Sequence, residues 1–305
     1  MNLNCSNQTK LYGLENNLKE LFNLYKKKRL PNKILLSGQK GIGKATLAYH
    51  LINFILSKNE DFSYDQENFF INEDNRSFRL IRNGTNPNFN LIDVNDEKKN
   101  IDINQIRSLI NVLNKSSLNS KPRFVLIDNI ELLNINSINA LLKIIEEPSK
   151  DIFFILINNN KKILPTLTSR CLNFKLSLSN KTSMEVTMKL LDNNLENIIN
   201  KDLLNYYWTP GKIYHLLKFS KENNINLLEL DLKRLISLLI DNPLYKKDVK
   251  AKKILYDFIE IFLIKNASLN FHFSHYFLYR IKNIKKFNLD DESLFIEFRY
   301  KLLNG

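Results

Sequence analysis

The chain has 305 residues, of which 44% are hydrophobic and 25% charged, and its formal net charge is +13. No run of about 18 uncharged apolar residues is present and the amino-terminal segment lacks an apolar signal core, so we expect neither a membrane-spanning helix nor a secretion signal. Two cysteines, Cys5 and Cys171, are too few for a disulfide scaffold or a structural zinc site, so we expect a cytoplasmic protein with reduced thiols.

The positive charge has two explanations that the sequence leaves open. Lysines are spread along the whole chain, which is typical of a compositional bias toward Lys, Asn and Ile. Short clusters such as YKKKR (25–29) and YKKDVKAKK (245–253) instead indicate an anionic partner such as nucleic acid.

Helical spacing and short apolar runs alternate over the first half of the chain. The pattern predicts helices at 11–30, 44–56, 101–117 and 136–148, and strands at 33–38, 89–94, 123–128 and 152–158. Pro31 and Pro148 end two of these helices, Asn136 or Ser137 caps the helix before Pro148, and the polar segment 57–90 is expected to be a loop or an irregular insertion. Continuous apolar strands that alternate with helices predict an α/β domain whose parallel sheet is covered on both faces.

From about residue 178 onward the pattern is almost entirely helical, for example over 182–199 and 251–284, with a break at WTPGK (208–212). No internal repeat is apparent. We therefore predict three parts: an α/β P-loop domain at 1–175, a small helical lid at 176–218 and an all-α carboxyl-terminal domain at 219–305.

The segment SGQKGIGKATLAYHL (37–51) fits the phosphate-binding pattern G-x-x-x-x-G-K, with glycines at Gly38, Gly41 and Gly43. Such glycines let backbone amides face phosphate oxygens in front of the positive end of a helix, and Lys44 would reach the β and γ phosphates. The next residue is Ala45, where a hydroxyl normally binds Mg²⁺. Thr46 does not replace that hydroxyl, because one residue along a helix turns a side chain by about 100°.

The segment FVLIDNIELLN (124–134) resembles a Walker B strand, with Asp128 positioned to approach magnesium through water. A hydrolysing enzyme of this class needs a second carboxylate directly afterward, and Asn129 stands there instead. A neutral amide cannot act as a general base, and Glu131 would substitute only if the loop bends unusually. The glycine loop therefore either binds nucleotide weakly or is an inherited remnant, and we predict poor ATP hydrolysis.

The segment LPTLTSRC (164–171) follows the last predicted strand and places Arg170 in a short linker. Taken alone, Arg170 is explained by an ordinary surface contact such as helix capping.

Three segments, LPNKILLSGQKGIGKATLA (30–48), NALLKIIEEP (139–148) and LPTLTSRC, stand in the order and spacing of bacterial clamp-loader subunits. Over about residues 10–215 the sequence resembles the delta-prime subunits of DNA polymerase III, AAA+ proteins related to gamma/tau and replication factor C. The resemblance implies an arc of five subunits that opens a sliding clamp and closes it on primed DNA, with the carboxyl-terminal helices as an oligomerising collar. The implied partners are the gamma/tau and delta subunits, the sliding clamp indirectly and primed DNA through the assembled complex in the replisome, and no membrane.

The same resemblance implies roles for individual residues. Ser169, Arg170 and Cys171 match the motif whose arginine finger reaches the ATP of a neighbouring subunit. Lys212 matches the start of the sensor 2 helix, where active members usually carry arginine, and Asn158 or Asn159 stands at the sensor 1 place. The resemblance implies a stator-like subunit that needs no cofactor, binds ATP or ADP weakly at most, and holds no zinc or other metal.

The sequence leaves two alternatives open. A gamma/tau-like ATPase would want a hydroxyl at Ala45 and a carboxylate at Asn129, and would usually carry a four-cysteine zinc module, whereas 57–90 contains no cysteine. A nucleic-acid-binding AAA+ protein outside the replisome is the other. The stretch FHFSHYFLYR (271–280) is explained equally by core packing and by an intersubunit interface.

Overall fold

The computed structural model describes residues 4–94, 100–115, 119–146, 151–247, 249–268, 271–287 and 289–303. The chain divides into two compact units, Met1–Ser183 and Met184–Gly305. The first unit is an α/β domain and the second is helical, as the sequence predicted. The further division of the second unit into a lid and a collar stays a prediction.

A five-stranded parallel sheet forms the centre of the first unit, in the order β2-β3-β4-β1-β5. Its strands are β1 (Lys33–Ser37), β2 (Phe89–Ile92), β3 (Arg123–Ile127), β4 (Ile152–Asn158) and β5 (Leu172–Lys175). The three central strands are nearly continuous runs of buried apolar residues, which a sheet covered on both faces requires.

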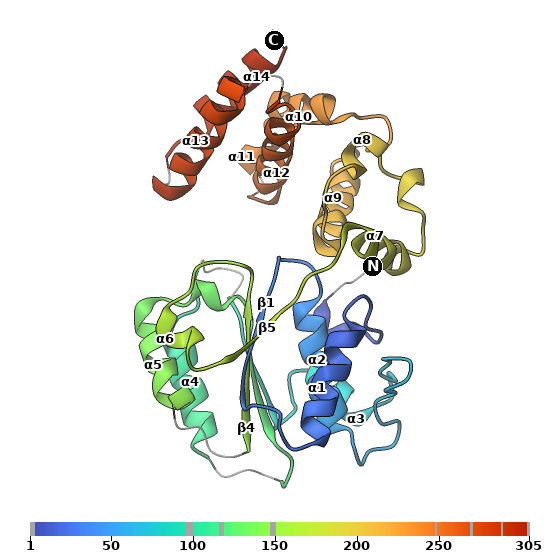
Figure 1. The fold of residues 1–305 in the computed structure, drawn as a ribbon, viewed down its shortest axis with the longest axis vertical. Helices are drawn as coiled ribbons and strands as arrows, with labels where there is room; N and C mark the ends of the chain where they lie inside the picture. The colour runs from blue at the N-terminus through green and yellow to red at the C-terminus, as the bar shows by residue number, and fades with distance from the viewer. Residues whose placement is uncertain are drawn as a thin grey trace. The chain divides into compact units, whose positions relative to one another are not determined.

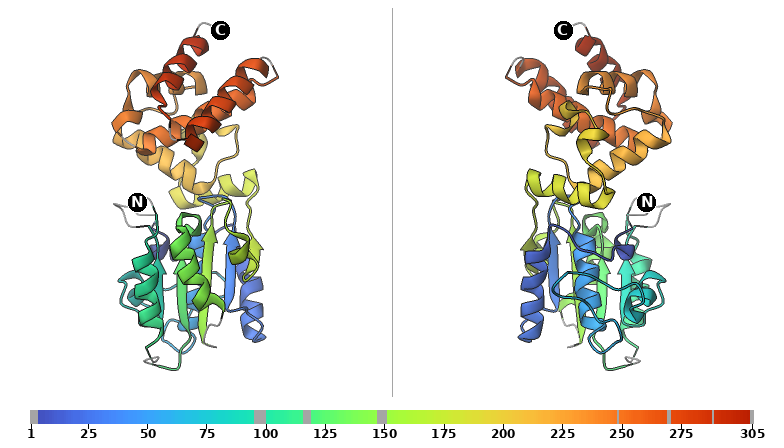
Figure 2. Two further views of the ribbon diagram at one scale, coloured as in Figure 1. Left: turned by 90° about the vertical axis from the view of Figure 1, so that its left-hand side faces the viewer. Right: turned by 90° about the vertical axis from the view of Figure 1, so that its right-hand side faces the viewer.

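Helices cover both faces of this sheet (Figure 1). One layer holds α1 (Glu15–Lys26), α2 (Lys44–Leu56) and α3 (Arg76–Arg82), and the other holds α4 (Ile103–Leu113), α5 (Ile135–Glu146) and the short α6 (Pro165–Thr168). Figure 2 shows each layer face on. Alternate residues of a strand point to opposite faces, so Leu36 joins the core under α1 and α2 while Leu35 joins the core under α4 and α5.

The second unit is built from α-helices around one hydrophobic core that includes Trp208, Phe258, Phe277 and Phe295. Its helices are α7 (Asn180–Leu191), which begins in the first unit, then α8 (Lys201–Leu204), α9 (Pro210–Glu222), α10 (Leu232–Asp241), α11 (Leu244–Lys247), α12 (Val249–Lys265), α13 (Phe271–Phe287) and α14 (Glu292–Leu303). In the part of the chain that the structure describes, no helix is long and apolar enough to span a membrane.

Three local predictions were wrong and one strand, β5, was missed. The polar segment 57–90 contains α3, because Asn75 caps it and Phe78 and Ile81 bury against α2. The linker around Arg170 is followed by β5, whose exposed residues gave no apolar signal. The helix predicted over 251–284 is two helices, α12 and α13.

The third wrong prediction concerns the start of α5. The helix begins at Ile135, and its first-turn amide at Ser137 is capped by the Asn134 side chain at 2.8 Å rather than by Asn136 or Ser137. The expected stop at Pro148 lies outside the described residues.

A Gly38→Ala substitution should destabilise the first unit by about 3 kcal/mol. A Cβ at Gly38 would lie 2.4 Å from the Leu176 carbonyl oxygen, which the sheet holds in place. Gly84→Ala is the matched control, since no atom lies within 4 Å of its added Cβ and only its φ of +69° costs about 1 kcal/mol. Urea unfolding of both variants measures the difference, and an equal loss at the two positions would contradict the close approach.

Candidate functional site

The carboxyl ends of β1, β3 and β4 bring three predicted segments to one edge of the sheet. The glycine loop follows β1, Asp128 follows β3, and Asn158 ends β4. The Gly38 N–H donates to the Asn158 carbonyl at 3.2 Å, so the loop starts in contact with the end of β4. In open α/β sheets this edge is where ligands bind.

The glycine loop has the conformation that its glycines allow. Gly41 and Gly43 have φ values of 87° and 97°, a left-handed region that other residues rarely adopt. Gly43 is the N-cap of α2, which begins at Lys44. The free N–H groups and the positive end of this helix therefore face the loop, the arrangement that binds phosphate.

Lys44 is nearly buried, at 4% exposure, and its ammonium group is held by the loop itself. Nζ donates to the Gly38 carbonyl at 2.8 Å and to the Gln39 carbonyl at 2.6 Å. Burial lowers the pKa of Lys44 to about 8, against the opposing effect of the Asp128 and Glu131 carboxylates. The lysine is thus positioned beside the loop, and burial makes its charged form energetically unfavourable there.

The two residues after Lys44 face other groups. Ala45 is partly buried and packs against the hydrophobic core on the α1 and α2 face. The Thr46 side chain forms a hydrogen bond with the Cys5 thiol. Burial, the largest effect, and the Asp128 carboxylate raise the pKa of the thiol, whereas this bond lowers it. Thr46 therefore lies beside Cys5, from the amino-terminal segment that sequence analysis left unassigned.

Asp128 and Asn129 occupy a polar cluster at the end of β3. Asp128 accepts the Asn129 backbone N–H at 2.8 Å, and the Asn129 side-chain amide donates to Asp93 at 2.8 Å. Burial and the neighbouring Asp93 carboxylate raise the pKa of Asp128 to about 6, although Lys40 and Lys44 act in the opposite direction. The Asn129 amide thus satisfies a carboxylate in a place where a second carboxylate would add repulsion.

The loop after β3 does bend sharply, and it brings Glu131 into the site. Asn129 has a left-handed φ of 55° and is followed by a single turn of 3₁₀ helix, Ile130–Leu132. The Asn159 side chain then donates to Glu131 and to Asn129, each at 2.9 Å, and the Asn159 backbone N–H reaches Glu131 at 3.3 Å. Of the two sensor 1 candidates, Asn159 joins this cluster, whereas the Asn158 side chain bonds to the Lys161 backbone.

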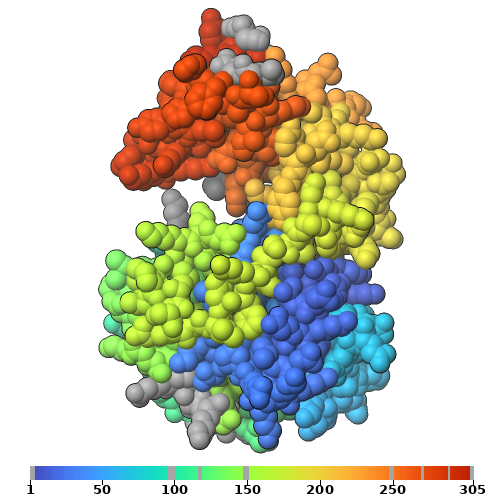
Figure 3. Space-filling model, viewed as in Figure 1, coloured from blue at the N-terminus to red at the C-terminus, as the bar shows by residue number. Residues whose placement is uncertain are grey.

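Arg170 lies at the surface of the first unit, on the segment that follows α6 and precedes β5. Its side chain is 35% exposed, with Nη2 at 2.7 Å from Glu146 Oε1 and Nη1 donating to the Thr166 carbonyl at 2.7 Å. The segment itself, yellow-green in Figure 3, forms part of the exposed surface. Such an exposed ion pair is worth about 1 kcal/mol or less, so the guanidinium is free to exchange partners at small cost.

The neighbours of Arg170 divide between surface and core. Ser169 is exposed and its hydroxyl donates to the Thr166 carbonyl at 3.2 Å. Cys171 is partly buried against the α4 and α5 core, and burial raises the pKa of its thiol to about 11. The cysteine thus anchors the segment inward while Arg170 remains outside.

Lys212 belongs to the second unit, whereas the other predicted site residues belong to the first. Its backbone N–H donates to the N-cap Thr209 of α9 at 3.3 Å, and its ammonium group lies 3.0 Å from Asp257. A nucleotide contact by Lys212 stays a prediction.

The residues present fit a phosphate chain better than a phosphate chain with its metal. The loop amides, the start of α2 and Lys44 suit phosphate oxygens. Asp128 could contact a magnesium ion, but Ala45 has no side-chain oxygen to bind it and packs against the core. Glu146 and Cys5 lie at the site although their sequence positions were not predicted to do so. Glu146 could have been found because it lies in the same motif set as Arg170, whereas the position of Cys5 depends on tertiary contacts.

Comparison with known proteins finds similarity to subunits of DNA polymerase III. A family model described as "DNA polymerase III, delta subunit" matches residues 13–180. The DNA polymerase III subunit delta' of Pseudomonas aeruginosa is 31% identical over 138 residues, or 45% of this chain and 40% of that protein. The delta' subunit of Buchnera aphidicola subsp. Baizongia pistaciae is 29% identical over 64% of this chain and 59% of its own length.

A DNA polymerase III gamma subunit is also similar, from Buchnera aphidicola subsp. Acyrthosiphon pisum. It is 26% identical over 90% of this chain and 76% of its own length. The chain spans only 40% and 59% of the length of the two delta' relatives.

An Asp128→Asn substitution should stabilise the protein near pH 7.5. A carboxyl whose pKa is raised in the fold from 3.8 to about 6 destabilises the fold when ionised, and this cost fades as the pH falls through 6 toward 3.8. The expected gain in the free energy of unfolding is up to about 3 kcal/mol above pH 6, and it should shrink toward zero near pH 4. The amide keeps the acceptor for the Asn129 N–H.

Thermal unfolding across this pH range measures the effect. Asp74→Asn is the control, because that side chain is 72% exposed and its removal should change stability little at any pH. A loss of stability at pH 7.5 in the Asp128 variant would contradict the proposed cost of its charge.

Proposed function

This chain belongs to the family of the DNA polymerase III delta subunit, and we propose that it is a delta-prime-like, stator subunit of a clamp loader. In this role it helps load a sliding clamp on primed DNA during replication, hydrolyses little or no ATP itself, and supplies Arg170 to the ATP of a neighbouring subunit. The observation that carries the proposal is the contrast between an exposed, exchangeable Arg170 and a nucleotide site that lacks two of its chemical groups.

The two substitutions at the nucleotide site act on different steps. Ala45 leaves the metal without a hydroxyl ligand, and its methyl group packs against the hydrophobic core. Asn129 leaves the attacking water without an adjacent base, and its amide is already bonded to Asp93 and Asn159. A site with both changes can bind phosphate through Lys44 and the loop amides, but it is poorly suited to hydrolysis. Weak binding of ATP or ADP is therefore part of the proposal, with no required cofactor.

The proposal assigns Arg170 to chemistry on another protein. An arginine delivered to a γ-phosphate stabilises transition-state charge, and such fingers contribute about 10³–10⁵ in rate in GTPases. The partial exposure of Arg170 and its weak pair with Glu146 support this role, because the side chain can leave Glu146 for a phosphate without unfolding its surroundings.

The second unit offers a surface for the proposed partners, which are the gamma/tau and delta subunits. Helices α13 and α14 expose several large apolar side chains, with Phe271, Tyr279 and Tyr300 each at least 60% exposed. The stretch 271–280 is thus divided, since Phe277 is fully buried while Phe271 and Tyr279 are not. Exposed aromatic residues gathered on neighbouring helices support an interface between subunits, and location in the replisome follows from this assembly.

A gamma/tau-like motor is the second candidate, and one observation favours it. Glu131 reaches the polar cluster beside Asn159, so a carboxylate is present in the site although it is not at the expected sequence position. A motor would use this carboxylate to orient water.

The purified chain should turn over ATP no faster than its Lys44→Ala variant, because Ala45 supplies no hydroxyl for the metal and Asn129 supplies no adjacent base. Phosphate release by the isolated chain, with and without primed DNA, measures this. Turnover that depends on Lys44 and falls in a Glu131→Gln variant would reject the stator and establish the motor.

Arg170→Ala should lower ATP turnover of the reconstituted clamp loader by about tenfold or more while leaving the fold intact. Arg79→Ala is the control, since Arg79 is also an exposed arginine with a single weak carboxylate contact, at 3.9 Å from Asp74. Glu146→Gln should preserve turnover, because it removes only the resting partner of Arg170. Steady-state turnover with the complete set of subunits is the measurement, and an unchanged rate in the Arg170 variant would remove the finger assignment.

A further inference from the structure

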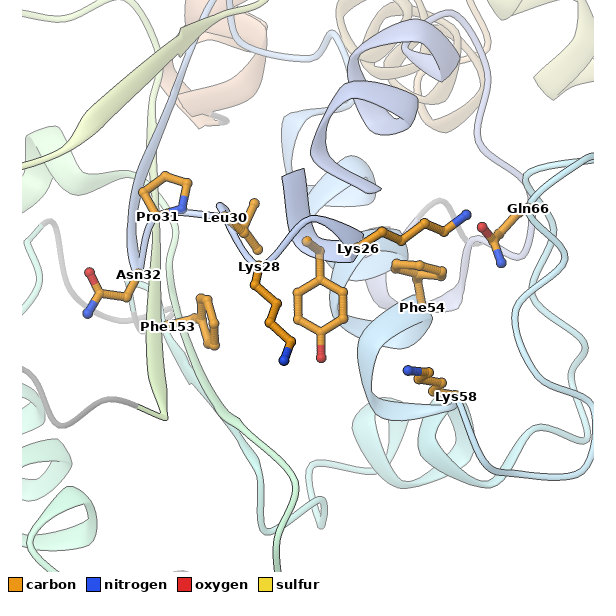
Figure 4. A pocket seen from close by; sticks show the side chains of 10 residues that line it. Lys26, Lys28, Leu30, Pro31, Asn32, Phe54, Lys58, Gln66 and Phe153 are labelled. Carbon is orange, nitrogen blue, oxygen red and sulfur yellow. The ribbon is translucent and has the colours of Figure 1, made fainter. Parts of the chain in front are cut away.

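A hollow of about 680 Å³ lies at the edge of the sheet opposite to the glycine loop. Its lining residues come from the end of α1, the turn into β1, the end of α2 and the start of β4, and include Gln66 from the segment after α2. Figure 4 shows their side chains. β1 begins at Lys33 beside the hollow and ends at Ser37 before Gly38, so five residues, or roughly 16 Å, separate the two edges. The hollow is therefore distinct from the candidate nucleotide site.

Three exposed lysines, Lys26, Lys28 and Lys58, line this hollow. Two of them come from the YKKKR cluster whose charge the proposed function leaves unused. Within the described residues, none of the three forms an ion pair, whereas nearby Lys121 is paired with Glu60 at 2.6 Å. Concentrated positive charge without carboxylates suits a ligand with several phosphates.

Aromatic rings line the same hollow. Tyr25 and Phe153 are partly exposed, and Phe153 stacks on the fully buried Phe124 with ring centroids 5.3 Å apart. Phe54 is more buried, and it packs edge-to-face against Tyr25 with the two ring centroids 6.1 Å apart. Rings supported from behind in this way present fixed apolar faces, on which a planar base can stack.

The backbone at Lys28 is in a conformation that favours glycine. Lys28 has a left-handed φ of 54° at the end of α1. Its N–H donates to the Tyr25 carbonyl at 2.9 Å and the Arg29 N–H donates to the Leu24 carbonyl at 2.8 Å, which is the hydrogen-bond pattern of a Schellman helix end. Glycine is strongly preferred at this position of the motif, so the fold keeps a lysine side chain there at a cost in backbone strain.

We propose that this hollow binds one or two nucleotides of a single-stranded nucleic acid, with phosphates on Lys26, Lys28 and Lys58 and a base against Tyr25 and Phe153. Charge combined with stacking is the binding mode of proteins that hold single strands without sequence preference. Only Asn32 and Gln66 among the lining side chains carry amides that could read a base edge, which favours binding without sequence specificity. The proposal concerns the isolated chain and is independent of the clamp-loader role.

Lys28→Gly separates binding from stability because the two should change in opposite directions. Relief of the left-handed strain should raise the unfolding temperature by roughly 2–4 °C. Loss of one phosphate contact should weaken binding of a fluorescein-labelled oligothymidylate of roughly ten nucleotides about fivefold at about 0.1 M salt. The slope of log affinity against log salt should also fall by about 0.7.

The full chain is titrated with this oligonucleotide by fluorescence anisotropy. Lys27→Gln is the matched control, because Lys27 is exposed in the same cluster but does not line the hollow. Lys58→Gln should weaken binding as Lys28→Gly does, although Lys58 is distant in sequence. If Lys27→Gln weakens binding as much as these two variants, the charge acts non-specifically and the proposed site is wrong.

A second comparison tests the stacking contribution. Tyr25→Leu keeps an apolar side chain and every lysine, yet it should weaken binding about fivefold or more. Tyr207→Leu, at another partly exposed tyrosine, should leave binding unchanged. An unchanged affinity in the Tyr25 variant, or equal displacement of the strand by inorganic tripolyphosphate at the same phosphate concentration, would show binding by charge alone and overturn the proposal.

Discussion

The parallel pairing of β1 with β4 on one side and with β5 on the other is the constraint on which the rest of the first unit depends. It fixes the Gly38 N–H on the Asn158 carbonyl and the Leu176 N–H on the Ser37 carbonyl, so the glycine loop is held between two neighbouring strand ends. Because all five strands run in the same direction, the loop after each strand comes to the same edge. This arrangement alone explains why distant segments of sequence meet in one polar site.

Within that site, the replacements at Ala45 and Asn129 are integrated into the structure. Ala45 contributes to the core, and Asn129 connects Asp93 to Asn159 through its amide. A hydroxyl at the first position or a carboxylate at the second would disturb these contacts, the latter by adding a third negative charge beside Asp93 and Asp128. The site thus keeps phosphate-binding geometry, while Ala45 and Asn129 stand where a hydroxyl and a second carboxylate would be expected.

The two surfaces proposed for partners differ in their physical character. Arg170 projects from a segment whose neighbour Cys171 is anchored in the core, so a single charge is presented from a firm base. The hollow at the opposite edge presents several charges together with aromatic faces. Because a strand length separates the hollow from the glycine loop, a ligand in one place does not occupy the other.

The sequence by itself determined the α/β arrangement, the glycine loop and the missing groups at Ala45 and Asn129, because apolar periodicity and fixed motif spacing are local signals. It did not reveal β5, whose residues are mostly exposed, or α3, which depends on burial against α2. Only the tertiary structure decided that Glu131 reaches Asn159, that Arg170 rests on Glu146, and that lysines far apart in sequence share one hollow. These relations depend on which strand ends and helix ends become neighbours, and chain order carries no local record of that choice.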